Sequence, residues 1–171
     1  WWIIGPFDNL GDSRKDTPHP VETNKIDLAK TYTGKNSIEI GWKRYDRPPG
    51  LRVDTEYLIQ LDEIFPGNNL AAYATTFITC SQATNALLSL GSRDGVVVWL
   101  NDRRIHAKLG PRIYMPKEDK IPISLDAGTN RLLIKITHGR GPWQFSAHLT
   151  DKNGDFLGMA SFPSSDSRSS P

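Results

Sequence analysis

The feature that most constrains the fold of this chain is an alternation of apolar and polar residues with a period of two. In residues 37–45, Ile38, Ile40 and Trp42 fall on one face of an extended segment, and charged residues fall on the other. The other segments with strand character are 1–4, 57–61, 73–80, 86–90, 96–100, 121–125, 131–137, 144–150 and 156–160. The apolar run 96–100 is too short for a helix, so we expect a strand buried on both faces.

Turn signals separate these segments. Arg93-Asp94-Gly95 and Asn153-Gly154 are short hairpin signals, because glycine adopts positive φ without a Cβ clash. Residues 126–130 read as a five-residue turn, and residues 68–74 are the one plausible helical turn. Elsewhere the apolar residues do not recur at helical spacing over more than about two turns. The sequence therefore predicts an all-β jelly-roll sandwich of two antiparallel sheets.

Length and composition favour a single domain. The chain has 171 residues, which suits one domain of ordinary size. We expect the β-sandwich module to span residues 1–162, with a Ser/Pro-rich linker or tail at 163–171 and a surface loop at 8–24. Cys80 is the only cysteine, which excludes an intramolecular disulfide. No apolar run approaches the ~20 residues of a membrane span.

Four segments resemble a known group of sugar-binding β-sandwiches. They are residues 2–7 (WIIGPF), residues 26–35 followed by Trp42, residues 90–101 (LGSRDGVVVWLN) and residues 125–135 (LDAGTNRLLIK). Together they are similar to galactose-binding-like jelly-roll modules appended to secreted bacterial polysaccharide-degrading enzymes. The resemblance implies a non-catalytic carbohydrate-binding module, an appended lyase or hydrolase, and a secreted protein whose signal peptide is not in this chain. A module of this kind requires no cofactor, and it can hold a structural calcium ion.

Catalytic and metal-binding motifs are mostly missing from the sequence. The four histidines show no spacing that places two of them on one helical face, and no G-x-S-x-G nucleophile elbow occurs. Residues 151–155 faintly resemble a calcium loop, but they lack the glycine and glutamate at its sixth and twelfth positions, which favours a turn. Adjacent carboxylates such as Asp62 and Glu63 would point to opposite faces of a strand, unlike a glycosidase pair.

Positive charge is concentrated between residues 93 and 143, which carry ten cationic and five anionic side chains. The residues that we expect to contact a ligand are Trp143, Arg140, Arg112, Arg104, Arg93 and Tyr114. Aromatic rings pack on the C–H faces of sugars, and guanidinium groups pair with carboxylates in a forked geometry. This combination favours an acidic, uronate-containing polysaccharide such as alginate, whose binding would tether an appended enzyme to its substrate.

Other interpretations compete with this hypothesis. The cations can form an ordinary solvated face. Trp42 and Trp99 are predicted to be core residues. Asp94 and Asn101 are predicted to have structural roles in turns. A second hypothesis is a structural or interaction sandwich that packs against a catalytic domain without binding sugar. A third is a small polysaccharide lyase, in which Tyr114 and His106 or His138 supply acid and base. Net charge of +2 argues against a nucleic-acid partner.

Overall fold

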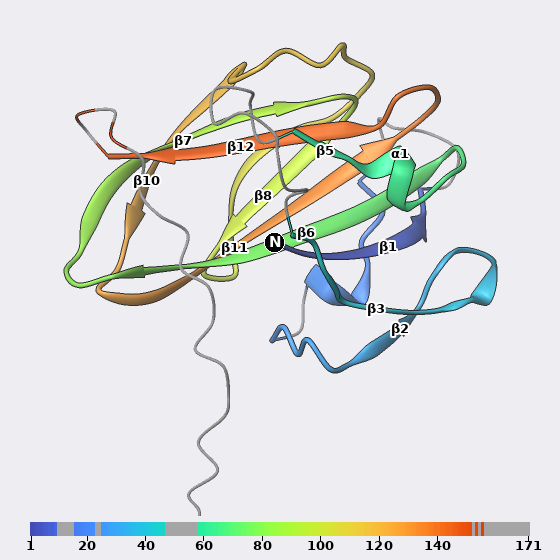
Figure 1. Ribbon diagram of the computed structural model, residues 1–171, viewed down its shortest axis with the longest axis horizontal. Coiled ribbons are helices and arrows are strands. Elements are labelled where there is room, and N and C mark those ends of the chain that lie inside the picture. The colour runs from blue at the N-terminus through green and yellow to red at the C-terminus, as the bar shows by residue number, and fades with distance from the viewer. Residues whose placement is uncertain (10–15, 23–24, 47–57, 152, 154, 156–171) are drawn as a thin grey trace, which may run out of the picture.

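The computed structural model describes residues 1–9, 16–22, 25–46, 58–151, 153 and 155, which form two stacked antiparallel sheets (Figure 1). The six-stranded sheet has the order β4 (Lys43–Arg44), β1 (Trp2–Asp8), β6 (Leu70–Cys80), β11 (Gly128–His138), β8 (Val96–Leu100) and β9 (Arg103–Lys108). The four-stranded sheet has the order β10 (Asp119–Leu125), β7 (Thr84–Ser92), β12 (Gln144–Thr150) and β5 (Leu58–Gln60). The hairpin of β2 (Thr31–Thr33) and β3 (Glu39–Gly41) forms a third, small sheet. The predicted all-β sandwich in one domain is confirmed.

The main hydrophobic core lies between the two large sheets. On β8, Val96 and Val98 pack into this core, while Val97 and Trp99 belong to a second buried cluster on the opposite face. Each of these side chains is at most 8% exposed. The strand predicted at residues 96–100 is therefore buried on both faces, as its unbroken apolar sequence indicates.

The second buried cluster covers the outer face of the six-stranded sheet. Tyr73 on β6 and Leu133 on β11 direct apolar side chains to this face, and side chains from residues 21–42 cover them. Val21, in the 3-10 helix η1 (Pro20–Glu22), is fully buried in this layer. The prediction of a surface loop at residues 8–24 is therefore wrong for Val21, because burying the outer face of the sheet removes apolar area from water.

Most of the predicted strands are confirmed, with shifts at their ends. The strands predicted at 96–100 and 144–150 match β8 and β12 in both bounds. Residues 68–74 do not form a helical turn, because β6 begins at Leu70 and pairs with both β1 and β11. Among the described residues the α-helical turn is instead α1 (Leu61–Ile64), and a second 3-10 turn, η2, spans Lys35–Ser37.

Two sequence predictions lie outside the described residues, and strands β2 and β9 were not among the predicted segments. The strand expected at 156–160 and the tail expected at 163–171 both fall beyond the part of the chain that the structure describes. Strand β2 was missed because its three residues are too few to show an alternation. No helix in the described segments is long and apolar enough to cross a membrane.

Candidate functional site

Three chain segments meet at one end of the sandwich, which we call the turn end: residues 93–95, 109–118 and 139–143 (Figure 1). The backbone amide of Asp94 donates to the carbonyl of Arg112 at 3.2 Å, and the amide of Arg93 donates to the carbonyl of Gln144 at 2.9 Å. The amide of Gly139 donates to the Asp94 carboxylate at 2.8 Å. These bonds join segments that are distant in sequence into one surface.

Asp94 organises the turn end. Its φ of 60° lies in the left-handed region that Asp and Asn tolerate better than most residues. Burial alone would raise the pKa of the Asp94 carboxyl, but the His138 ring at 3.5 Å and the Gly139 amide outweigh burial and hold that pKa below its usual value. Asp94 therefore has the structural role that the sequence assigned to it, with its carboxylate bonded across to the end of β11.

The prediction that Trp143 is an exposed stacking ring is wrong. Its side chain is 0% exposed, and its indole stacks on the His138 ring with centroids 5.0 Å apart. The carbonyl of Trp143 accepts a hydrogen bond from the amide of Leu61 at 2.6 Å, which fixes the start of α1. Because the ring is part of the hydrophobic core, it cannot contact a polysaccharide from this position.

Arg112 lies at the turn end, but carboxylates neutralise it. Its guanidinium is 2.7 Å from Asp119 and 3.2 Å from Glu118, and its Nε donates to Ser92 Oγ at 3.1 Å. Burial would raise the pKa of Asp119, but the adjacent Arg112 outweighs it and lowers that pKa. With a side chain only 11% exposed, Arg112 braces the 109–118 loop against β7 and β10 and does not offer an open charge.

Tyr114 is anchored at the turn end beside two exposed apolar residues. Its hydroxyl donates to Ser146 Oγ at 2.9 Å, and its half-buried ring packs over Gly91. A Cβ at Gly91 would lie 2.5 Å from the carbonyl oxygen of Met115, so glycine permits the close approach of this loop. Ile113 is 75% exposed and Met115 is 57% exposed. Sequence analysis missed both, because isolated apolar residues in a loop give no periodic signal.

Arg93 and Arg140 differ from Arg112 in making no ion pair with a described carboxylate, although Arg93 is close enough to the Asp94 carboxylate to help lower its pKa. No described carboxylate lies within ion-pair distance of either guanidinium. Arg140 is exposed, and a Cβ at the adjacent Gly141 would lie 3.6 Å from Arg93 Nη2. The Nε of Arg93 is buried and has no hydrogen-bond partner in the described segments. Five of the six predicted residues therefore lie in the segments that meet at the turn end, and two of them, Arg93 and Arg140, form no ion pair with a described carboxylate.

Arg104, the sixth predicted residue, does not belong to the turn end. It lies on β9, and its Nη1 is 3.1 Å from the carboxylate of Asp16, on the outer face of the six-stranded sheet. Its side chain is 47% exposed. The expectation that Arg104 lies with the other three arginines is therefore wrong. Arg104 pairs with Trp99 near the start of β9, whereas the loop 109–118 follows the other end of that strand.

The residues proposed for acid and base chemistry are not placed for it. His138 is 1% exposed beneath the turn end, and His106 Nε2 lies 3.5 Å from Asp119. In the described part of the chain, no three His, Cys, Asp or Glu side chains are grouped to hold a metal ion. The Asp151 carboxylate accepts from the amides of Asn153 and Asp155 at 2.8 and 2.9 Å, which is the arrangement of a tight turn.

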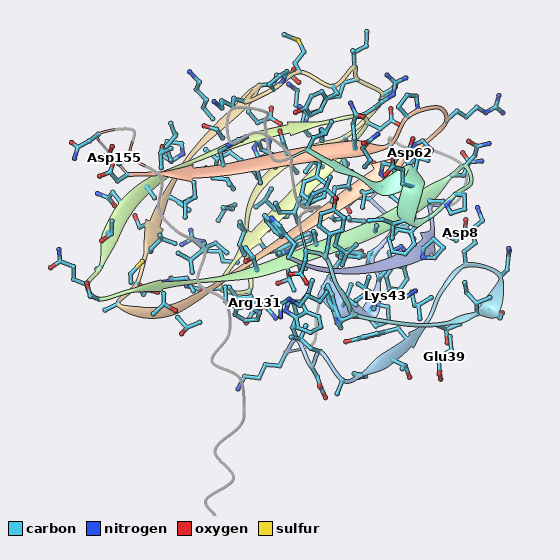
Figure 2. The ribbon with its side chains drawn as sticks, viewed as in Figure 1. Asp8, Glu39, Lys43, Asp62, Arg131 and Asp155 are labelled. Carbon is cyan, nitrogen blue, oxygen red and sulfur yellow. The ribbon has the colours of Figure 1, made fainter. Side chains whose placement is uncertain are left out.

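A shallow groove of about 290 Å³ lies away from the predicted residues. Its lining is mainly apolar, with Pro6, Ile64 and Pro66 among its walls. Glu39 and Lys43 add opposite charges at its margin, on the side of the hairpin β2–β3 (Figure 2). Sequence analysis did not find this groove, because it forms only when β1, the hairpin and the residues after α1 come together.

Comparisons with known proteins find similarity to parts of several solved structures only. No family model matches the chain, and no curated protein matches it. Among solved structures, the PA14 domain of the antifreeze protein MpAFP has a TM-score of 0.43 at 11% identity, covering 51% of this chain and 47% of that one. An anti-sigma factor domain-containing protein from Clostridium clariflavum has a TM-score of 0.47 at 12% identity, covering 61% and 37%.

A third similar structure is the β-glucosidase from Kluyveromyces marxianus in complex with glucose, with a TM-score of 0.43 at 16% identity. The match covers 63% of this chain and 16% of the enzyme. The chain therefore matches less than half the length of each of the three proteins. At these TM-scores and identities the likeness assigns neither a family nor a function to the chain.

Proposed function

We propose that this chain is a non-catalytic carbohydrate-binding module that holds an acidic polysaccharide at the turn end. The observation that supports the proposal is the contrast among neighbouring arginines. Arg112 is neutralised by two carboxylates, whereas Arg93 and Arg140 have no described carboxylate within ion-pair distance. A guanidinium fork matches the planar carboxylate of a uronate and binds it with two parallel hydrogen bonds.

The surroundings of these two arginines suit a sugar chain. The half-buried Tyr114 ring and the exposed Ile113 and Met115 provide apolar surface for C–H faces of pyranose rings. The Nε of Arg93 is buried, so a carboxylate would meet this arginine through its terminal guanidinium nitrogens. Tyr114 takes over the stacking role that Trp143, inside the core, does not have.

The module would act by tethering. Each contact to the polymer is weak, but an appended lyase or hydrolase held close to its substrate meets it at a raised effective concentration. This role needs no cofactor and no catalytic group in the module itself. It also places the protein outside the cytoplasm, where polysaccharide polymers are degraded.

Affinity electrophoresis against a panel of neutral and uronate-containing polysaccharides tests the proposal. We expect alginate or another polyuronate to retard the wild-type chain at low salt, and we expect salt to reduce that retardation because ionic contacts are screened. The double variant Arg93→Ala/Arg140→Ala should lose retardation. The control Lys43→Ala/Lys120→Ala also removes two positive charges, but from exposed sites outside the turn end. This control should still be retarded by the polysaccharide. Equal retardation of both double variants, or none of the wild type, would contradict the proposal.

A structural or interaction sandwich is the second candidate, and the exposed Ile113 and Met115 favour it. Two large apolar side chains on a loop that is otherwise anchored suit a protein contact as well as a sugar contact. The double variant Ile113→Ser/Met115→Ser separates the two. If the appended catalytic domain no longer packs against the module while polyuronate binding persists, the apolar pair serves the domain contact.

A further inference from the structure

A buried lysine lies outside the turn end, on the outer face of the six-stranded sheet. Lys135 on β11 is 0% exposed, and its Nζ lies 2.8 Å from Asp16 Oδ1 and 2.9 Å from Glu22 Oε1. The same Nζ donates to the carbonyl of Thr17 at 2.6 Å. The Tyr73 hydroxyl donates to Glu22. We call Lys135, Asp16, Glu22 and Tyr73 the Lys135 cluster.

Aromatic side chains enclose the buried part of the cluster. The Tyr73 ring lies 5.7 Å from the lysine Nζ, and the side chains of Phe7 and His19 stack beside that ring. Burial, followed by the charge of Lys135, lowers the pKa of His19 to about 4, so the imidazole is neutral at neutral pH. Glu22 accepts hydrogen bonds from both Lys135 Nζ and the Tyr73 hydroxyl, so its carboxylate is placed to take the proton that Nζ must lose before it attacks a carboxyl carbon.

We propose that Lys135 and Asp16 condense to form an intramolecular amide bond. Nζ of Lys135 attacks Cγ of Asp16, the Cγ–Oδ1 bond breaks, and Oδ1 leaves as water. Both protons of that water come from the lysine ammonium, so the step needs no oxidant, reductant or other co-reactant. Glu22, at hydrogen-bond distance from Nζ, carries a proton from Nζ to the leaving oxygen.

Arg104 supplies the other element that this reaction requires. Its Nη1 lies 3.1 Å from Oδ2 of Asp16, the oxygen that gains negative charge when Nζ adds to Cγ. A positive group placed at a developing oxyanion stabilises the tetrahedral intermediate. Arg104, which the sequence suggested as a ligand-binding residue, is here assigned to the internal reaction.

Proximity makes an otherwise slow condensation feasible. The fold holds Nζ and the Asp16 carboxyl in contact although 119 positions separate them in sequence, and such positioning replaces an encounter in solution. Burial of Lys135 keeps bulk water from reversing the bond. The product would tie residues 16–22 covalently to the centre of the six-stranded sheet.

Intact mass spectrometry of the purified full chain in denaturant tests the proposal. We expect the measured mass to be lower than the sequence mass by one water. Trypsin should release a branched peptide that joins residues 16–25 to residues 132–140, with no cleavage after the acylated Lys135. A wild-type chain at its full sequence mass, with separate peptides, would overturn the proposal and leave the cluster as an ion pair.

Four variants test which residues take part in the reaction. Asp16→Asn should lose ammonia in place of water, because the leaving group becomes an amide nitrogen. Lys135→Arg should show its full sequence mass, while the control Lys120→Arg, exposed on β10, should keep the deficit. Water loss that persists in Lys135→Arg would also overturn the proposal, because cyclisation at Asp94-Gly95 produces the same mass change. Glu22→Gln should slow the appearance of the deficit after refolding.

Discussion

The turn end and the Lys135 cluster both contain several charged side chains, but they differ in whether the cations have carboxylate partners. In the Lys135 cluster, the lysine is fully buried and has three oxygen partners within 2.9 Å. At the turn end, Arg93 and Arg140 have no described carboxylate within ion-pair distance. The comparison teaches that excess positive charge in the sequence does not by itself mark a binding site. The placement of the carboxylates decides which cations remain for a ligand.

Removing the central cation of the Lys135 cluster should have the largest effect on stability. Lys135→Met removes the amide bond proposed above together with the contacts of Nζ to Glu22 and Thr17. The loss should be at least about 3–5 kcal/mol, which is what breaking a buried ion pair costs. Denaturant unfolding measures the loss. Lys120→Met, a control on an exposed strand position, should change the free energy of unfolding by less than about 0.5 kcal/mol. Equal losses in the two variants would remove the distinction between buried and exposed lysines.

Arg112 provides a further test of the comparison. It lies at the turn end, but like Lys135 it is paired with two carboxylates. Arg112→Met should lower the free energy of unfolding by about 2 kcal/mol, since it leaves the 5% exposed Asp119 carboxylate without its closest cation. Thermal or denaturant unfolding checks this. An effect no larger than that of Arg140→Met would show that Arg112 is an open cation after all.

The two regions should lose stability in different ranges of pH. Burial lowers the pKa of His19, beside the Lys135 cluster, from 6.5 to about 4. Between those values the unfolded chain binds a proton that the folded chain does not, so stability should fall as pH decreases from 6.5 to about 4. The lowered pKa values of Asp94 and Asp119 act in a lower range, because their contribution is lost only as pH falls below 3.8.

Unfolding free energies measured at several pH values between 7 and 3 separate these contributions. His19→Gln should flatten the dependence above pH 4 and leave the dependence below 3.8 in place. If His19→Gln leaves the upper range unchanged, another group titrates there.

The smallest stability effects are expected at the open cations. Arg140→Ala, at an exposed side chain, should change the free energy of unfolding by less than about 0.5 kcal/mol, and Arg93→Ala, at a half-buried one, by less than about 1 kcal/mol. Differential scanning calorimetry of each variant beside the wild type measures this. A loss above 1 kcal/mol from Arg140→Ala would mean that its guanidinium supports the fold.

The strands could be predicted from sequence because their signal is local. The apolar run of β8 and the alternation in β12 gave the bounds of both strands. The same alternation could have placed Trp143 correctly, because it lies two residues before Phe145 and four before Ala147, and all three are buried in one core. The glycine and proline before Trp143 suggested a loop, but the period of the strand continues through it.

The Lys135 cluster could not be predicted, because its partners are distant in sequence. Lys135 lies in an alternating strand where a lysine normally faces solvent. Its burial depends on residues 16–22, which fold over the outer face of the sheet and bring carboxylates from 119 and 113 positions away. The neutralisation of Arg112 by Asp119 likewise follows from the pairing of β10 with β7.

The account rests on Arg93 and Arg140 being the guanidinium groups that meet a ligand, and NMR of the arginine Nε–Hε groups tests it most directly. On addition of a uronate oligosaccharide at low salt, the signals of Arg93 and Arg140 should shift with a common saturation curve, while those of Arg112 and Arg104 stay in place. A titration that leaves Arg93 and Arg140 unmoved, or that moves Arg112 or Arg104 instead, would contradict the account.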